Sequence, residues 1–257
     1  MDAGGRDAGR RATDGGEPQD SAAALRARMV ERQLAARGIR DPDVLAAMRA
    51  VPRHLFVPEE LRHAAYDDSP LPIGFGQTIS QPYMVACMTE ALRVNVRSRV
   101  LDVGAGSGYQ TAVLAELAGE VFAIERVVVL EAQARERLAT MGYDNVVVTL
   151  GDGSLGWSEH APYDGIMVAA AATQAPPRLL DQLAEGGRLV VPLGEAHRDQ
   201  VLTIYERHGH DFVVERGLRC RFVPLVGDHG AAGASRPGEG LGDDDLEGPG
   251  RWEEVEP

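Results

Sequence analysis

The sequence predicts an α/β fold with a doubly wound, mostly parallel sheet and a helical cap on its N-terminal side. Two observations predict the sheet. Short apolar runs alternate with helical-period segments from residue 99 onward, as expected of parallel strands buried on both faces. A glycine-rich turn also joins the first apolar run to the helical segment after it, with Gly104, Gly106 and Gly108 at alternate positions. The cap is predicted by helical patterns that fill the chain before residue 52.

The apolar runs predict seven strands. Five of them should be the parallel strands: 99–103, 121–125, 146–150, 165–169 and 188–191. Two later runs, 201–205 and 212–215, are expected to be antiparallel, and residues 220–225 should close the core. Helices are expected between the parallel strands, including one from Leu179 to about Gly186.

Two helices should form the cap. One is expected over residues 25–37, with Gly38 as its C-cap, and a second should start at Asp41-Pro42 and stop before Pro52. Residues 71–83 read as a flexible glycine-containing loop, after which a helix should begin near Ser80 and Pro82.

Composition predicts one domain between two tails. Residues 25–228 are long enough for one sizeable core. Residues 1–24 and 229–257 are poor in large apolar side chains, so we expect both to be disordered. The first of them also lacks the apolar core of a signal peptide. Oligomeric state and the function of the tails are not readable from the sequence.

Charge and cysteine usage exclude several classes of protein. The formal net charge of −13 argues against nucleic acid as a partner, and no apolar run is long enough to span a membrane. Only two cysteines are present, Cys87 and Cys220, which suits a reducing cytoplasm. His208-Gly-His210 has no third ligand at useful spacing, so no metal site is predicted.

The glycine turn predicts a nucleotide site, and three acids indicate which ligand it takes. NAD, FAD and S-adenosylmethionine (SAM) sites all use such glycines. Here Asp102 ends the first strand, Glu125 ends the second, and Asp152 follows the third within Gly151-Asp-Gly153. An acid suits the cationic SAM better than a pyrophosphate. Glu125 should accept hydrogen bonds from the ribose hydroxyls and Asp152 from the adenine amino group.

Taken singly, each acid also has an ordinary structural interpretation. Asp102 could cap the following turn, Glu125 could be a solvated strand end, and Asp152 is a common turn residue. The acids share the carboxyl edge of the sheet, where such folds bind ligands. Their combination therefore favours SAM.

Several motifs together resemble the protein-L-isoaspartate O-methyltransferase family. The most specific is Gly76-Gln-Thr-Ile-Ser-Gln-Pro-Tyr-Met-Val-Ala86, supported by Arg221-Phe-Val-Pro-Leu225. The others are Leu101-Asp-Val-Gly-Ala-Gly-Ser-Gly-Tyr109, Ile124-Glu-Arg126, Gly151-Asp-Gly153 and Gly186-Gly-Arg-Leu-Val-Val-Pro-Leu-Gly194. The resemblance spans about residues 25–228. Val226 departs from it, because the family often carries a hydroxyl there.

The resemblance implies a SAM-dependent enzyme that methylates the free α-carboxylate of L-isoaspartyl residues in damaged proteins and peptides. The ester then collapses to a succinimide, which starts repair. It also implies a seven-stranded, Rossmann-like methyltransferase sheet whose last two strands are exchanged relative to most such enzymes.

Site residues follow from the same resemblance. Ser80 is the expected catalytic residue, orienting the acceptor carboxylate; its alternative is a plain helix N-cap. Val223 and Pro224 should border the bound peptide. The expected cofactor-binding residues are Thr78, Ile79, Asp102, Gly104, Gly106, Ser107, Glu125, Asp152 and Gly153.

Two rival functions remain open at this point. The same scaffold could methylate one dedicated aspartate of a peptide natural product, or it could bind SAM without turnover.

Overall fold

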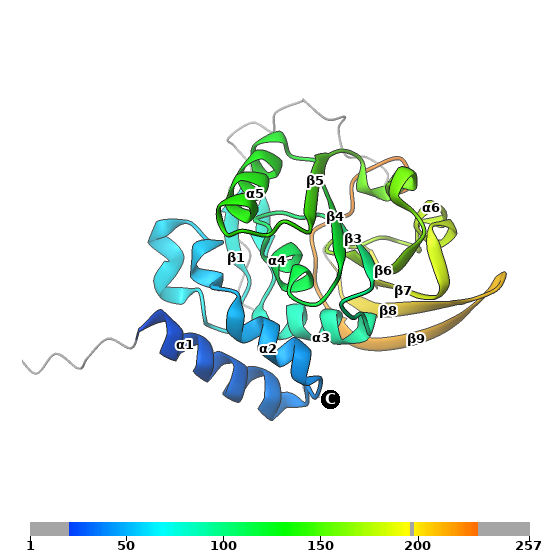
Figure 1. Ribbon diagram of the computed structural model, residues 1–257. Helices are drawn as coiled ribbons and strands as arrows, with labels where there is room; N and C mark the ends of the chain where they lie inside the picture. The colour runs from blue at the N-terminus through cyan, green and yellow to red at the C-terminus, as the bar shows by residue number, and fades with distance from the viewer. Residues whose placement is uncertain (1–20, 196–197, 231–257) are drawn as a thin grey trace, which may run out of the picture.

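The computed structural model describes residues 21–195 and 198–230 (Figure 1). Its main feature is a seven-stranded sheet in the order β5-β4-β3-β6-β7-β8-β9. The strands are β3 (Arg99–Val103), β4 (Glu120–Glu125), β5 (Val146–Leu150), β6 (Tyr163–Val168), β7 (Leu183–Leu193), β8 (Gln200–His208) and β9 (Asp211–Cys220). The first five are parallel, and β8 and β9 are antiparallel. The predicted fold class is confirmed. Strands β8 and β9 lie beside β7 in chain order, and this is the exchange of the last two strands that the resemblance implied.

Helices cover both faces of this sheet. Strand β3 shows the division: Val100 packs with α3 (Pro82–Leu92) and α4 (Tyr109–Ala115), whereas Leu101 packs on the opposite face with α6 (Pro177–Asp181). Helix α5 (Val128–Thr140) packs on the α4 side. Short 3-10 turns η5 (Gly153–Leu155) and η6 (Ser158–His160) connect β5 to β6.

The N-terminal cap consists of helices that pack beside α3 and α4. Helix α1 (Ala22–Met29) continues through a π turn η1 (Val30–Leu34) and a 3-10 turn η2 (Ala35–Arg37), and α2 (Pro42–Ala50) follows. Two 3-10 turns, η3 (Arg53–Leu55) and η4 (Glu59–Ala64), complete it. Asp41 caps α2 as predicted, and Gly38 ends η2 with φ of 104°. In Figure 1 this blue part of the chain lies beside the sheet.

The structure corrects two helix boundaries. Helix α1 starts at Ala22 rather than Leu25, because Ser21 caps it by accepting a hydrogen bond from the Ala24 N–H. The helix expected from Leu179 to Gly186 is only the five residues of α6, since Leu183 already pairs with Tyr163 in the sheet. The C-terminal tail was predicted to be disordered from residue 229, but the His229 N–H donates to the Ser154 hydroxyl and the Gly230 N–H to the Gly227 carbonyl. Residues 1–20 and 231–257 lie outside the described residues.

The segment predicted as a flexible loop contains a hairpin. Strands β1 (Leu71–Gly74) and β2 (Gln77–Ile79) pair antiparallel, and the turn between them has positive φ at Gly74, Phe75 and Gly76. Leu71, Ile73 and Ile79 are buried, so an alternating pattern was present in the sequence. The hairpin gives the segment before α3 a fixed shape.

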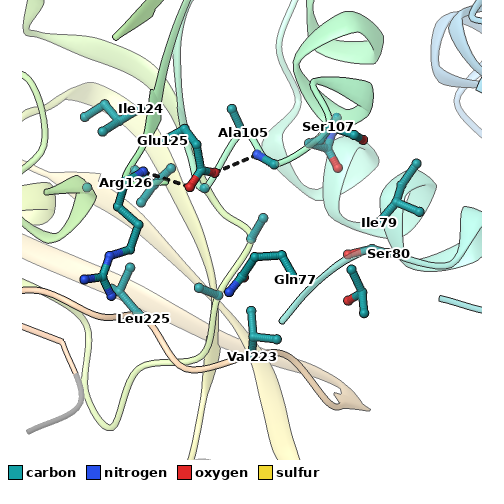
Figure 2. A pocket seen from close by; sticks show the side chains of 18 of the residues that line it. Gln77, Ile79, Ser80, Ala105, Ser107, Ile124, Glu125, Arg126, Val223 and Leu225 are labelled. Carbon is teal, nitrogen blue, oxygen red and sulfur yellow. Dashed lines mark hydrogen bonds between the residues drawn. The ribbon is translucent and has the colours of Figure 1, made fainter. Parts of the chain in front are cut away.

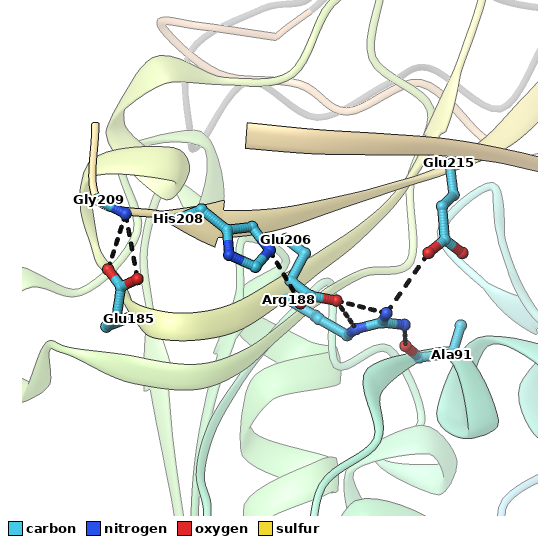
Figure 3. Close-up of polar contacts among 7 residues, drawn as sticks. All are labelled: Ala91, Glu185, Arg188, Glu206, His208, Gly209 and Glu215. Carbon is cyan, nitrogen blue, oxygen red and sulfur yellow. Dashed lines mark hydrogen bonds and ion pairs between the residues drawn. The ribbon is translucent and has the colours of Figure 1, made fainter. Parts of the chain in front are cut away.

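A buried arginine joins the antiparallel side of the sheet to α3 (Figure 3). Arg188 on β7 is 4% exposed, and its Nε and Nη2 donate to Glu206 on β8 over 2.8 and 2.5 Å. Its Nη1 donates to the Ala91 carbonyl over 3.0 Å, and Glu215 on β9 lies 3.5 Å from Nη2. His208 contacts the other oxygen of Glu206 over 3.0 Å. This network fixes the C-terminal end of α3, whose N-terminal end follows Ser80.

Candidate active site

The glycine turn between β3 and α4 depends on left-handed backbone. Gly104, Gly106 and Gly108 have φ of 90°, 54° and 87°, which side chains with a Cβ rarely adopt. The N–H groups of Gly104 and Ala105 donate to the Ile124 carbonyl over 2.8 and 3.1 Å. The turn is therefore tied to β4, and its glycines expose backbone to the space above it.

Glu125 ends β4 directly beside this turn (Figure 2). Its Oε2 accepts a hydrogen bond from the Gly106 N–H over 2.8 Å. Its Oε1 accepts from the Arg126 and Val127 N–H groups over 2.8 and 2.9 Å. Three backbone donors hold the carboxylate in one orientation. Because an ionised carboxylate has about four acceptor sites, it can still accept from a ligand.

One cavity of about 910 Å³, open mouth included, brings these elements together. It is formed by the glycine turn, β2 and Ser80, the ends of β4 and β5, and residues 223–226. Ten of the predicted site residues line it: Thr78, Ile79, Ser80, Gly104, Gly106, Ser107, Glu125, Gly153, Val223 and Pro224.

Two predicted acids do not line the cavity. Asp102 is fully buried beneath the turn, where its Oδ2 accepts a hydrogen bond from the Thr111 hydroxyl over 2.6 Å. Asp152 accepts from the N–H and hydroxyl of Ser154 and from the Asp228 N–H. Of the three acids on which the sequence argument relied, only Glu125 faces the cavity.

Burial raises the pKa of Asp102 to about 7. The Thr111 hydrogen bond opposes this rise, and the nearby Glu125 carboxylate adds to it. The other oxygen, Oδ1, is buried without a hydrogen-bond partner among the described residues. Asp102 is thus a buried acid that titrates near neutral pH.

Ser80 lies between β2 and α3 and is not a helix cap. The N-cap of α3 is Gln81, so the alternative interpretation of Ser80 was wrong. The side chain of Ser80 lies at the cavity edge, on the same wall as Gln77 and Ile79 (Figure 2). Among the described residues its hydroxyl makes no hydrogen bond.

The segment carrying Val223 and Pro224 forms a further part of the cavity wall. The Ala171 N–H donates to the Val223 carbonyl over 2.8 Å, and the Leu225 N–H donates to the Ala171 carbonyl over 2.7 Å. These bonds anchor the segment to the end of β6 and leave its other side towards Gln77 (Figure 2).

The fold and this cavity agree with comparisons to known proteins. The family model for protein-L-isoaspartate(D-aspartate) O-methyltransferase matches residues 25–230. The chain belongs to this family.

Individual relatives support the assignment. Protein-L-isoaspartate O-methyltransferase 1 of Rhodopseudomonas palustris is 57% identical over 82% of this chain and 87% of its own length. A protein-L-isoaspartate O-methyltransferase of Synechococcus is 55% identical over 82% of this chain and 91% of its own length.

Two solved structures share the fold. A protein-L-isoaspartate O-methyltransferase has a TM-score of 0.72 at 28% identity, covering 80% of this chain and 67% of that one. A Plasmodium falciparum structure described as a beta-aspartate methyltransferase has a TM-score of 0.67 at 30% identity, covering 78% and 98%. That structure is a complex with S-adenosyl-L-homocysteine.

The structure also adds wall residues of the methyltransferase that were not predicted. Gln77, Gln110 and Arg126 all line the cavity. Gln77 lies in the Gly76–Ala86 motif and Arg126 in the Ile124-Glu-Arg126 motif, so the family resemblance was the signal that could have found them. Gln110 donates to the Thr89 hydroxyl over 2.9 Å, a contact between α4 and α3 that no local pattern indicates.

The cavity fits SAM on the evidence of its own residues. Gly153 is closely packed in the cavity wall, because an added Cβ would lie 2.4 Å from Cγ1 of Val103 and the turn would have to move. Glycine there lets the 153–155 turn pack closely on Val103, which also lines the cavity. Glu125 offers oriented acceptors for hydroxyl groups, and the glycine turn offers an open backbone surface.

Proposed function

We propose that this protein transfers the methyl group of SAM to the free α-carboxylate of L-isoaspartyl residues in proteins and peptides. The observation that carries the proposal is that the glycine turn, Glu125, residues 77–80 and residues 223–226 all line one shared cavity. A cofactor site and an acceptor site are therefore contiguous. The names of close relatives support the same activity. The protein is a SAM-dependent carboxyl methyltransferase that starts the repair of isoaspartyl residues.

We propose the following roles on the cofactor side. Glu125 accepts hydrogen bonds from the ribose hydroxyls, since its carboxylate is held in the cavity wall by three backbone donors. Gly104, Gly106 and Ser107 form the surface under the amino-acid part of the cofactor, and Thr78 and Ile79 close the opposite wall.

The two acids outside the lining act indirectly in this proposal. Asp102 adds negative charge beneath the turn when it is ionised, which favours a cationic ligand above it. Asp152 holds the 152–154 turn through Ser154, so that Gly153 stays at the cavity wall.

The acceptor needs orientation rather than activation. A carboxylate with an ordinary pKa near ~4 is already anionic at neutral pH, so no general base is required. The protein must align the attacking oxygen with the methyl carbon and sulfur and exclude water. Positioning of this kind can contribute on the order of 7–11 kcal/mol to the barrier reduction.

Ser80 is the residue proposed to orient the acceptor. Its hydroxyl has no partner among the described residues and lines the cavity, so it can donate a hydrogen bond to one carboxylate oxygen. Val223 and Pro224 border the peptide backbone on the other side. The methyl ester then loses methanol as the backbone nitrogen attacks it, giving the succinimide.

The test uses labelled SAM and a pair of peptides that differ only in an isoaspartyl or aspartyl linkage. We expect base-labile methyl on the isoaspartyl peptide alone. Methyl on a dedicated aspartyl peptide would instead support the natural-product function. If neither peptide is methylated although the protein binds SAM, the protein is a SAM-binding module without turnover, and the proposal is rejected.

We also propose that the enzyme works in the cytoplasm. Its two cysteines, Cys87 and Cys220, are both free thiols, as expected in a reducing compartment. Fractionation of cells that produce the protein tests this, and recovery outside the cytoplasm would contradict it. Among the described residues, no helix is long and apolar enough to cross a membrane.

A further inference from the structure

Helix α3 begins without a cap from its own flanking residues. Its N-cap, Gln81, makes no side-chain hydrogen bond to the helix, and Pro82 has no N–H to offer. Tyr83 therefore carries the first amide that needs an acceptor. That acceptor is Oδ1 of Asp68, 15 residues upstream, at 3.2 Å.

Asp68 is in turn held by the N-terminal cap. Arg37, the last residue of η2, pairs through Nη1 with Oδ2 of Asp68. The Arg37 guanidinium also lies 3.7 Å from the centre of the Tyr83 ring, whose hydroxyl donates to the Arg37 carbonyl over 3.4 Å. Each of the three residues contacts the other two. The triangle Arg37–Asp68–Tyr83 thus connects the helical cap to the first turn of α3.

This arrangement has a consequence for Ser80. A serine that caps a helix accepts a hydrogen bond from the second or third helical amide, which fixes its side chain. If Ser80 were the cap, that amide would be Tyr83, because Pro82 has no N–H. Here the Tyr83 amide is already bonded to Asp68. Ser80, two residues before Pro82, keeps its hydroxyl at the cavity wall with no hydrogen bond to the described residues.

We propose that Asp68 is a positioning residue for methyl transfer: it caps α3 from outside and so leaves the Ser80 hydroxyl available to the acceptor carboxylate. This rests on the function proposed above. Asp68 also places a negative charge at a helix N-terminus, where it is stabilising, while Arg37 balances that charge. Loss of the hydrogen bond between Asp68 and the Tyr83 amide would shift the Ser80 backbone. A misplacement of about 1 Å can cost ~100-fold in rate.

The experiment compares Asp68→Ala with Asp68→Asn in the full chain. We expect Asp68→Ala to lower kcat for an isoaspartyl peptide by about tenfold or more. SAM affinity should stay within about twofold, because the glycine turn and Glu125 are untouched. Asp68→Asn should recover most of kcat, since its amide oxygen can accept from the Tyr83 N–H. The matched control is Asp67→Ala, which removes an exposed neighbouring carboxylate and should leave kcat unchanged.

Three results would overturn the inference. They are an unchanged kcat in Asp68→Ala, an Asn variant no better than Ala, and a fall in kcat matched by an equal loss of SAM affinity. If Asp68→Ala does not fold, Asp68→Ser replaces it, because the shorter side chain cannot reach Tyr83.

Hydrogen exchange of the Tyr83 amide separates this inference from the proposed function. The amide should exchange faster in Asp68→Ala or Asp68→Ser than in Asp68→Asn, whatever the enzyme methylates. A wild-type protein that is inactive on isoaspartyl peptides would reject the proposed function. Equal exchange of the Tyr83 amide in all variants would instead reject the role of Asp68 as the cap of α3.

Discussion

The carboxylate of Glu125 accepts a hydrogen bond from the Gly106 N–H over 2.8 Å, which joins the end of β4 to the middle of the glycine turn. The two residues are 19 positions apart in the chain. The same carboxylate also faces the cavity. Glu125 therefore shapes the turn and offers acceptors to the cofactor at once.

Replacing Glu125 with Ala should weaken SAM binding. Both the ribose acceptors and the anchor of Gly106 are lost, and hydrogen bonds to charged groups contribute about 1.5–3 kcal/mol each. We expect the Kd for SAM, measured by calorimetry, to rise about 10- to 100-fold. Glu120→Ala, on the exposed start of the same strand, is the control and should change Kd by less than about twofold. Equal effects of the two substitutions would contradict the role of Glu125.

Ser80→Ala should lower turnover without lowering cofactor affinity. The hydroxyl is proposed to orient the acceptor only, so kcat should fall about 10- to 100-fold while the Kd for SAM stays within about twofold. Steady-state kinetics on an isoaspartyl peptide measure this. Ser158→Ala, an exposed serine in η6, is the control. Full turnover by Ser80→Ala would remove its catalytic role.

Asp102 should make the stability of the protein fall as pH rises towards neutrality. Its pKa is about 7 in the folded protein against 3.8 for the unperturbed group, so the folded state holds a proton that the unfolded state releases. This contribution is fully present below pH ~4 and is lost as pH rises through ~7. Its size is on the order of 4 kcal/mol.

Urea unfolding of Asp102→Asn between pH 4 and 8 checks that prediction. The variant keeps an acceptor for Thr111 but cannot ionise, so its stability should depend less on pH than that of the wild type. Parallel pH profiles of the two proteins would show that Asp102 does not titrate in this range.

Gly153→Ala should reduce both stability and SAM affinity. An added Cβ would lie 2.4 Å from Cγ1 of Val103, so the 153–155 turn must move, at a cost of about 1–3 kcal/mol. Gly151→Ala is a matched control, because its Cβ would meet Ile124 at an ordinary 3.5 Å. Thermal unfolding and SAM titration of both variants test this. A larger loss of stability and SAM affinity in Gly151→Ala than in Gly153→Ala would contradict this prediction.

Arg188→Ala should destabilise the protein by about 2–4 kcal/mol, since it leaves Glu206 and the Ala91 carbonyl without their buried donor. Urea unfolding measures the change. The control is Arg198→Ala, which removes the exposed pair with Glu195 and should cost less than about 1 kcal/mol. Similar losses in both variants would mean that burial of Arg188 contributes little.

The sequence by itself determined the presence of the seven strands of the main sheet, the glycine turn and Glu125. These features are local: continuous apolar runs define buried strands, and the positions of Gly104, Gly106 and Gly108 require left-handed backbone wherever the turn folds. Glu125 was predictable because the carboxyl ends of adjacent parallel strands share one edge of the sheet. Recognition of the 76–86 and 221–225 motifs identified the acceptor.

Only the tertiary structure decided which side chains reach the cavity. Asp102 and Asp152 occupy the same edge as Glu125, yet one turns into the core towards Thr111 and the other towards Ser154. Thr111 belongs to another element, α4, so no pattern around Asp102 encodes that contact. The contact of Asp152 with Ser154 is the local turn that the sequence offered as its alternative, and the Asp228 N–H joins it from far along the chain.

The capping of α3 by Asp68 was also decided by the tertiary structure. Ser80 stands where a local rule would place a capping residue, but Asp68 reaches the Tyr83 amide because Arg37 and the N-terminal helices hold it there. Hydrogen bonds between residues distant in sequence depend on how separate elements pack. The sequence therefore predicts the elements of this site, and packing determines the task of each side chain.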